Sequence, residues 1–242
     1  MNAVLDDLYQ QRQVVSRSGK RFDLFPCSIG RHKGQSLYQW VRRTRPKTTI
    51  EIGCAFGVST LFICQALRDN GGGIHHVIVP WETGQWDSVG LDLIEKAGLG
   101  DVMRFYGVPS YVQLPKLLEE GTQVDFAFLD GQKLFDYVMI DCFYIGLMLP
   151  VGGVMSFDDP WLGSVRKAAR FLVHNCRYRL INYTNRLLQG APASPWMRAT
   201  AEQLLGLRYG APLIKPAFRF ECLLYLQKTH EDDRVWDWYR EF

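Results

Sequence analysis

The sequence predicts an α/β protein built on a doubly wound, mostly parallel β-sheet. Short apolar runs of about four to eight residues alternate with longer segments whose apolar residues recur at helical spacing. Glycines mark most of the connections, and acidic residues stand at the ends of several of the apolar runs. Strands that alternate with helices through short connections are typical of parallel sheets, which bind ligands at the carboxyl ends of their strands.

The clearest unit is Thr48–Leu67, in which a β-prone run, a small-residue loop and an apolar helix follow one another. The run is Thr48–Ile52 and the loop is Gly53–Gly57. Ser59 and Thr60, which are good helix caps, introduce the helix. Glycines let a backbone approach a ligand closely, and a helix N-terminus offers unpaired N–H groups to an anion. This stretch therefore predicts a nucleotide-binding turn.

The other elements follow in order along the chain. Before Thr48 we expect a weakly amphipathic helix over 2–14, an irregular segment over 22–34 and a second helix over 35–45, all packed outside the sheet. After it we expect strands at 74–80, 101–106, 124–129, 153–157, 178–183 and 218–227, with helices at 86–97, 115–120, 135–149 and 164–174. The chain thus divides into an N-terminal helical segment, 1–47, and a domain over 48–242 with an insertion at about 185–216.

Composition excludes several classes of protein. The chain has 242 residues, 47% of them hydrophobic, with a formal net charge of +3. Its basic residues are scattered, which argues against nucleic acid as a partner. The N-terminus lacks the pattern of a signal peptide, and no apolar run is long enough to span a bilayer. Cys54, Cys64 and Cys142 lie in apolar segments, as reduced buried thiols do. We expect a soluble cytoplasmic domain with no membrane partner.

The loop resembles a specific cofactor motif. It lacks the Lys-Ser/Thr pair of a phosphate-binding loop and the spacing of the dinucleotide fingerprint. Glu51-x-Gly53-x-Ala55-x-Gly57 resembles motif I of the class I S-adenosylmethionine (SAM) methyltransferases. The alternative is an ordinary turn between strand and helix in another α/β protein.

A second stretch narrows the resemblance. The span Phe126–Asp159 resembles the small-molecule and sugar O-methyltransferases of class I, with Asp-Gly after one strand, Pro-x-Gly-Gly, and Asp-Asp after the next. The spacing from Thr48 to Asp159 follows that family. The resemblance implies a Rossmann-like, seven-stranded, mostly parallel sheet with an antiparallel last strand, and SAM as the cofactor.

The resemblance also implies roles in cofactor binding. Motif I would make room for the methionyl part of SAM, its acid would bind the amino group, and a hydroxyl at the helix start would bind the carboxylate. The residues concerned are Glu51, Gly53, Ala55, Gly57, Ser59 and Thr60, and we also assign Asp130 to the cofactor site.

The sequence departs from the family at the end of the second strand. The family has an acid there that binds both ribose hydroxyls, whereas this chain has Val79, which cannot accept a hydrogen bond through its side chain. Glu82 is our candidate replacement, and Trp81 is a candidate for stacking on the adenine. The alternative is a chain in which cofactor binding is weakened or lost.

Three acids could hold a metal ion. Asp130 ends one predicted strand, and Asp158 and Asp159 end its neighbour, so their carboxylates should converge. Oxygen ligands without His or Cys select a hard ion such as Mg²⁺. The divalent-metal O-methyltransferases resemble this arrangement. The alternative is that Asp159 caps the next helix and Asp158 contacts substrate or water.

Lys133 is the candidate general base, together with Asp130 in the catalytic group. It lies three residues after Asp130, where the catechol-type branch of the family carries a catalytic lysine. That role requires a pKa lowered by burial or by a metal, and an exposed lysine at a helix start is the alternative. One of the two strand histidines, His75 or His76, should be satisfied within the packing of sheet and helix.

The predicted function is methyl transfer from SAM to an oxygen, or less favourably a nitrogen, of a small-molecule acceptor. The alternative is a non-catalytic methyltransferase-fold protein that binds a ligand or partner, for which Val79 is the motive. A nicotinamide-dependent dehydrogenase would need the dinucleotide fingerprint. The sequence leaves open the acceptor, the use of a metal and the formation of a homo-oligomer.

Overall fold

The fold is taken from a computed structural model, which describes residues 2–184 and 223–242. The chain groups into two compact units, residues 1–113 (unit 1) and 114–242 (unit 2), and each is described by itself. The predicted insertion at 185–216 and the first part of the predicted strand 218–227 lie outside the described residues. The predicted division at residue 47 stays a prediction.

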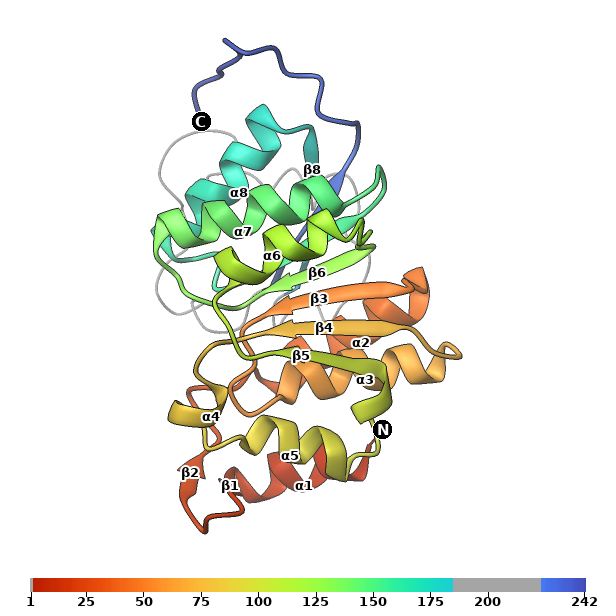
Figure 1. The fold of residues 1–242 in the computed structure, drawn as a ribbon, viewed down its shortest axis with the longest axis vertical. Helices are drawn as coiled ribbons and strands as arrows, with labels where there is room; N and C mark the ends of the chain where they lie inside the picture. The colour runs from red at the N-terminus through yellow and green to blue at the C-terminus, as the bar shows by residue number, and fades with distance from the viewer. Residues whose placement is uncertain (1, 185–222) are drawn as a thin grey trace. The chain divides into compact units, whose positions relative to one another are not determined.

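Unit 1 is built around three parallel strands in the order β5-β4-β3 (Figure 1). They are β3 (Thr48–Ile52), β4 (Ile74–Ile78) and β5 (Met103–Tyr106). The register places Thr49 opposite His75 and Glu51 opposite Val77. Because parallel strands buried on both faces need apolar side chains, the buried polar residues among them are exceptions to be explained.

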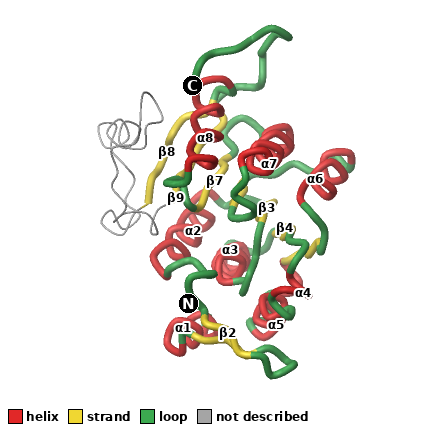
Figure 2. The backbone as a smooth tube through the Cα atoms, turned by 90° about the vertical axis from the view of Figure 1, so that its left-hand side faces the viewer, coloured by secondary structure: helices red, strands yellow, loops and turns green. Residues whose placement is uncertain are grey.

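Helices α2 (Arg31–Thr44) and α3 (Val58–Asp69) lie side by side in both views (Figure 1 and Figure 2). A Cβ at Gly34 would come within 2.2 Å of Phe62, so the two helices approach too closely for any larger residue. Gly34 therefore lies inside α2 rather than before it, and the helix begins four residues earlier than its sequence predicts. A glycine used for close packing is easily mistaken for a helix breaker.

The other elements of unit 1 differ from the prediction in several places. The predicted first helix ends early, as α1 (Ala3–Gln11), and is followed by an antiparallel hairpin of β1 (Gln13–Val15) and β2 (Arg21–Asp23). The predicted helix 86–97 is instead α4 (Glu82–Gln85) and α5 (Val89–Lys96). Asp87 and Ser88 have φ of 51° and 57°, which no α-helix can accommodate. A short 3₁₀ helix, η1 (Gly100–Val102), occupies the start of the strand predicted at 101–106, so β5 begins only at Met103.

The described residues of unit 2 include four strands, in the order β6-β7-β9-β8. They are β6 (Phe126–Leu129), β7 (Val154–Asp158), β8 (Tyr178–Thr184) and β9 (Leu223–Lys228), and β9 runs antiparallel to both of its neighbours. Helices α7 (Phe135–Met148) and α8 (Gly163–Asn175) belong to this unit. Helix α6 (Ser110–Glu119) begins in the last residues of unit 1, and its remaining residues belong to unit 2. The seven sheet strands found in the described part of the chain, of mixed direction with an antiparallel last strand, confirm the predicted fold class.

Most buried side chains are apolar, and the buried lysine of β9 has a structural role. Lys228 Nζ donates to the carbonyl oxygens of Gly146 and Leu149 at 3.2 and 2.8 Å, and so satisfies two acceptors at the end of α7. Cys54, Cys64 and Cys142 are buried and free of disulfides, as predicted. Among the described helices, none combines the length and hydropathy that crossing a membrane would require.

Candidate functional site

The loop after β3 adopts a backbone conformation that only small residues tolerate well. Gly53, Ala55 and Gly57 have φ of 95°, 46° and 69°. A Cβ at Gly57 would lie 3.1 Å from the carbonyl oxygen of Gly90, so a side chain there meets both strain and backbone. The Gly53 N–H donates to Ile78 O at 3.0 Å, which ties the loop to the end of β4. The motif I residues therefore form one close-packed turn in unit 1.

Phe56 anchors this loop, to which it belongs, against two other segments of unit 1. Its ring is 5.4 Å from that of Phe22 on β2 and 5.0 Å from that of Trp86, which follows α4. The hairpin and the α4–α5 connection thus hold the loop through one buried aromatic side chain, at distances typical of aromatic pairs. The sequence does not predict this contact because β1 and β2 are too short to show an alternating pattern.

Glu51 lies fully buried in β3, directly before the loop. Its Oε2 accepts hydrogen bonds from Thr60 Oγ1 at 2.6 Å and His75 Nε2 at 2.9 Å. Its Oε1 is buried and has no partner among the described residues. A buried carboxylate oxygen without a donor is costly, so Oε1 is a candidate acceptor for a bound donor.

Ser59 and Thr60 are not helix caps, contrary to the sequence prediction. The N-cap of α3 is Gly57, no side chain caps the helix, and both hydroxyl residues are buried within its first turn. Thr60 uses its hydroxyl on Glu51 instead. Gly57 can begin the helix because it reaches the left-handed region without strain.

The end of β4 is apolar, as the sequence indicates. Val79 is buried in a cluster with Cys54 and Val77, so no ribose-binding acid lies at this position. Trp81 is 65% exposed, and its predicted stacking on an adenine stays a prediction.

Glu82, the candidate replacement acid, lies against the same loop. It is only 1% exposed, its Oε1 accepts from Gly90 N at 3.0 Å, and its Oε2 has no partner among the described residues. A Cβ at Gly90 would be 2.8 Å from both Glu82 Oε1 and Ala55 O, which places the carboxylate beside motif I. Burial raises the pKa of Glu82 to about 7, although backbone N–H groups at the start of α5 oppose the shift.

In unit 2, the ends of β6 and β7 bring three carboxylates together. One oxygen from each of Asp130, Asp158 and Asp159 lies within 4.8 Å of the others, as the sequence predicts. Three hard oxygen donors at this separation fit a divalent cation such as Mg²⁺ or Mn²⁺. The residues present therefore suit the predicted metal.

Lys133 joins the same cluster. Its Nζ is 2.9 Å from Asp130 Oδ1 and 3.9 Å from Asp159 Oδ2, so it is not the solvated lysine of the alternative. Burial lowers the pKa of Lys133, but attraction to Asp130, Asp158 and Asp159 outweighs burial and leaves the pKa raised. For Asp130, burial raises the pKa, and the nearby positive charge of Lys133 only partly opposes this rise. The lowered pKa expected of a general base is therefore not found for the lysine in this arrangement.

Asp159 is not a helix cap, which was the alternative to a metal ligand. Helix α8 begins at Gly163 after Leu162, and no side chain caps it. Asp159 has φ of 54°, an uncommon conformation outside glycine, and its Oδ1 accepts from Trp161 Nε1 at 3.1 Å. Backbone strain of this kind is found where a side chain must be aimed.

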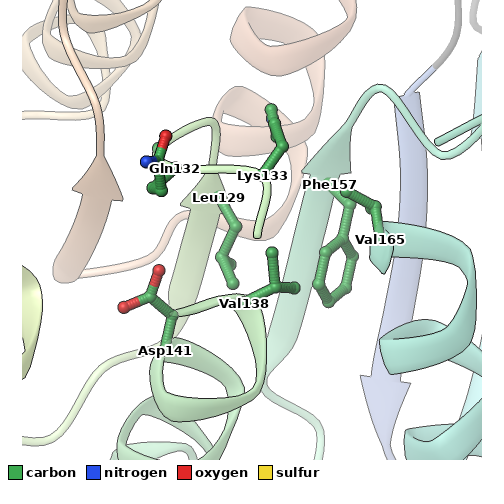
Figure 3. Close-up of a pocket in the computed structure, with 8 residues that line it drawn as sticks. Leu129, Gln132, Lys133, Val138, Asp141, Phe157 and Val165 are labelled. Atoms are coloured by element: carbon green, nitrogen blue, oxygen red, sulfur yellow. The ribbon is translucent and has the colours of Figure 1, made fainter. Parts of the chain in front are cut away.

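A small hollow lies beside the cluster, within unit 2 (Figure 3). Leu129, Phe157 and Val138 form its apolar wall, while Gln132 and Lys133 come from the loop after β6. Asp141 also lines the hollow, which therefore combines apolar walls with one basic and one acidic side chain.

His75 is the main residue of the site region whose role the sequence does not predict. Both strand histidines are satisfied by packing, since His75 contacts Glu51 and Thr49, and His76 contacts Tyr106 Oη at 3.0 Å. The parallel register between β3 and β4 is what brings His75 beside Glu51. A signal existed in the sequence: a histidine in an otherwise apolar buried strand needs a polar partner.

The chain is similar in sequence to known methyltransferases. The family described as "Methyltransferase domain" matches residues 50–160. The chain is 32% identical over 142 residues to a caffeoyl-CoA O-methyltransferase of Petroselinum crispum, covering 57% of this chain and 56% of that protein. It is 33% identical over 138 residues to caffeoyl-CoA O-methyltransferase 2 of Petunia hybrida, covering 55% of this chain and 54% of the relative. The chain thus spans little more than half the length of these curated relatives.

Solved structures extend the likeness in fold over most of the chain. An O-methyltransferase from Bacillus cereus, in complex with S-adenosylhomocysteine (SAH), has a TM-score of 0.66 and 14% identity, covering 94% of this chain and 92% of that one. An O-methyltransferase from Streptomyces achromogenes, in complex with SAM, has a TM-score of 0.67 and 16% identity, covering 95% and 91%. At such identities the likeness shows the fold alone.

Proposed function

Because the chain has the class I methyltransferase fold and a methyltransferase domain at residues 50–160, we propose that it transfers a methyl group from SAM to an oxygen of a small-molecule acceptor. The proposal rests chiefly on Glu51, a buried carboxylate at the base of a glycine turn with one oxygen left unpaired. An ammonium group is the donor that such an oxygen accepts best, and the methionyl part of SAM carries one.

The residues of unit 1 fit this cofactor. Gly53, Ala55 and Gly57 would hold the methionyl part, with the start of α3 beside its carboxylate. Glu82 would take the ribose hydroxyls in place of an acid at Val79, since its Oε2 is an unused acceptor beside the loop. When bound, SAM supplies a methyl group on a sulfonium, so the protein has to align the acceptor and remove its proton.

The residues of unit 2 would act on the acceptor. Asp130, Asp158 and Asp159 would hold a divalent cation, which would supply positive charge to acceptor oxygens and lower the pKa of a hydroxyl. Lys133 would then accept the hydroxyl proton, because a cation at the carboxylates would weaken the attraction that now raises its pKa. Without a cation, Lys133 itself neutralises the cluster and the acceptor would have to ionise unaided.

Two neighbouring oxygens are the acceptor feature that a bound cation would recognise. The relatives named caffeoyl-CoA O-methyltransferases support a phenolic acceptor of this kind. We therefore propose an acceptor with vicinal oxygens on a planar ring, held by a cation at Asp130, Asp158 and Asp159. The second candidate function, ligand binding without catalysis, is favoured by one observation, the apolar end of β4 at Val79.

Calorimetric titration with SAH, with and without Mg²⁺, tests the cofactor half of the proposal. We expect micromolar binding that is lost in Gly53→Arg, because the arginine would fill the loop at a φ of 95°. A failure to bind SAH under either condition would leave only the non-catalytic alternative.

Turnover of catechol against phenol tests the acceptor half. The two probes share a ring and differ by one hydroxyl, so a preference for catechol that requires Mg²⁺ supports vicinal recognition by a cation. Equal turnover of both, insensitive to a chelator, would overturn the metal role and retain the methyltransferase.

A further inference from the structure

We infer that His75 is a positioning residue for the cofactor site: it fixes the Glu51 carboxylate so that Oε1 alone faces the ligand. This inference rests on the proposed function, because it assigns to SAM the donor that Glu51 lacks. The proposed function gives His75 and Glu51 no role toward the acceptor, so a change at His75 would alter the affinity for the cofactor.

Both ring nitrogens of His75 are engaged by buried side chains. Its Nε2 is 2.9 Å from Glu51 Oε2 and its Nδ1 is 2.8 Å from Thr49 Oγ1. All three side chains are wholly buried. A carboxylate accepts hydrogen bonds and does not donate them, so the Nε2 proton of His75 points at Glu51. The imidazole is thereby held at both ends.

The contacts of Glu51 are one-sided. Oε2 receives both donors, from Thr60 and His75, while Oε1 receives none within the described chain. Two bonds to one oxygen fix the rotation of the whole carboxylate. The unpaired oxygen therefore has a set direction before any ligand arrives, which lowers the cost of binding a donor there.

The network also spans the cofactor turn. Thr60 lies in the first turn of α3 and Glu51 lies in β3, on either side of the Gly53–Gly57 loop. His75 connects both to β4, the strand whose end receives the Gly53 N–H. A buried polar network without a structural need would be replaced by apolar residues at little cost, so its presence indicates a use for Glu51.

The sharpest test compares two amides at one site. His75→Gln can place an N–H where Nε2 lies and keep the bond to Glu51, whereas His75→Asn is shorter and can keep only the bond to Thr49. We expect SAH affinity, measured by calorimetry, to fall about tenfold in His75→Asn and to stay within about threefold of wild type in His75→Gln. His76→Phe is the matched control, because His76 contacts Tyr106 and not Glu51.

A double-mutant cycle separates positioning from general packing. If His75 acts through Glu51, His75→Asn should weaken binding in the wild-type background and have no further effect in Glu51→Gln. Additive losses would mean that His75 acts elsewhere and would overturn the inference. Thermal unfolding of each variant checks that every protein titrated is folded.

The outcomes distinguish this inference from the proposed function. Wild type that does not bind SAH removes the proposed function and the inference with it. Wild type that binds SAH, with His75→Asn binding equally well, removes only the inference. Equal losses in His75→Asn and His75→Gln would also overturn it, since the rescue by the longer amide would be missing.

Discussion

The two units each place acids at the carboxyl ends of parallel strands, but they treat the charge in opposite ways. In unit 1, Glu51 is wholly buried and two donors hold one of its oxygens. In unit 2, Asp130 and Asp159 keep about a quarter of their side chains exposed, at 25% and 26%, and share Lys133. The Glu51 carboxylate is held by a hydroxyl and an imidazole. The carboxylates of Asp130 and Asp159 lie close together beside the ammonium group of Lys133.

The two arrangements favour different ligands. Under the proposed function, the fixed carboxylate of Glu51 would accept one donor from one direction, at a place where its burial already excludes water. The three carboxylates of unit 2 repel one another, Lys133 balances only part of their charge, and they would favour a multivalent cation. Unit 1 would thus recognise its ligand by geometry and unit 2 by charge. Four measurements test this contrast.

The largest effect is expected at Lys133. Lys133→Met removes the proposed base, and kcat should fall by about 10² to 10⁴, the range for loss of general base catalysis. Binding of Mn²⁺ should tighten, because a competing positive charge has left the carboxylates. Lys167→Met, an exposed lysine on α8, is the matched control for turnover. A kcat within fivefold of wild type would mean that Lys133 serves only to neutralise the cluster.

The loop of unit 1 should be the next most sensitive position. Gly57→Val places a β-branched residue at φ of 69°, with its Cβ 3.1 Å from Gly90 O. Overpacking and backbone strain together should weaken SAH binding about a hundredfold. Gly71→Val carries similar strain at φ of 94° but has no atom within 4 Å, so it should bind SAH normally. Similar losses in both would point to general destabilisation instead.

Asp158 tests the charge side of the contrast. Asp158→Asn removes one of three negative donors, and affinity for Mn²⁺ should fall at least about tenfold. SAH binding in the absence of metal should not change. Asp136→Asn, an exposed acid at the start of α7, provides the control. Unchanged Mn²⁺ affinity in Asp158→Asn would show that the cluster is not a cation site.

The smallest effect is a pH dependence at Glu82. Its pKa is about 7 in the folded protein, above the ordinary value of 4.5, so the folded state binds the proton more tightly than the unfolded chain. Its contribution to stability is therefore complete at low pH and is lost as pH rises through about 7. Glu82→Gln should remove this loss, and its free energy of unfolding relative to wild type should rise by about 1–2 kcal/mol between pH 5.5 and 8. Urea unfolding at both pH values measures it, and a pH-independent difference would contradict it.

Much of the fold follows from the sequence, because strands buried on both faces are nearly continuous apolar runs. β3 and α7 begin where their patterns begin, and the acids of unit 2 meet because their strands are parallel neighbours. The motif spacing also predicts where Glu51 and Gly57 lie, at the end of β3 and the start of α3. These features depend on local pattern and on a single topological rule.

The parts that the sequence does not reveal depend on contacts between distant segments. The role of His75 comes from register, the placement of Gly34 from the ring of Phe62, and the break at Asp87 from two residues with positive φ. From the sequence alone, the hydroxyl of Thr60 could equally cap the helix or bind a buried acid. Local propensity cannot decide such cases, because the deciding partner is elsewhere in the chain.

The place of β9 between β7 and β8 bears on the order in which the two units can be completed during synthesis. All three strands of the sheet in unit 1 precede residue 107, so they can pair while the rest of the chain is still on the ribosome. In unit 2, β7 cannot pair along this edge until β9 has been synthesised. β9 follows β8 in the chain and pairs with both β7 and β8. Until then β7 has an unpaired edge, and unpaired strand edges are the places at which nascent chains pair wrongly with their neighbours.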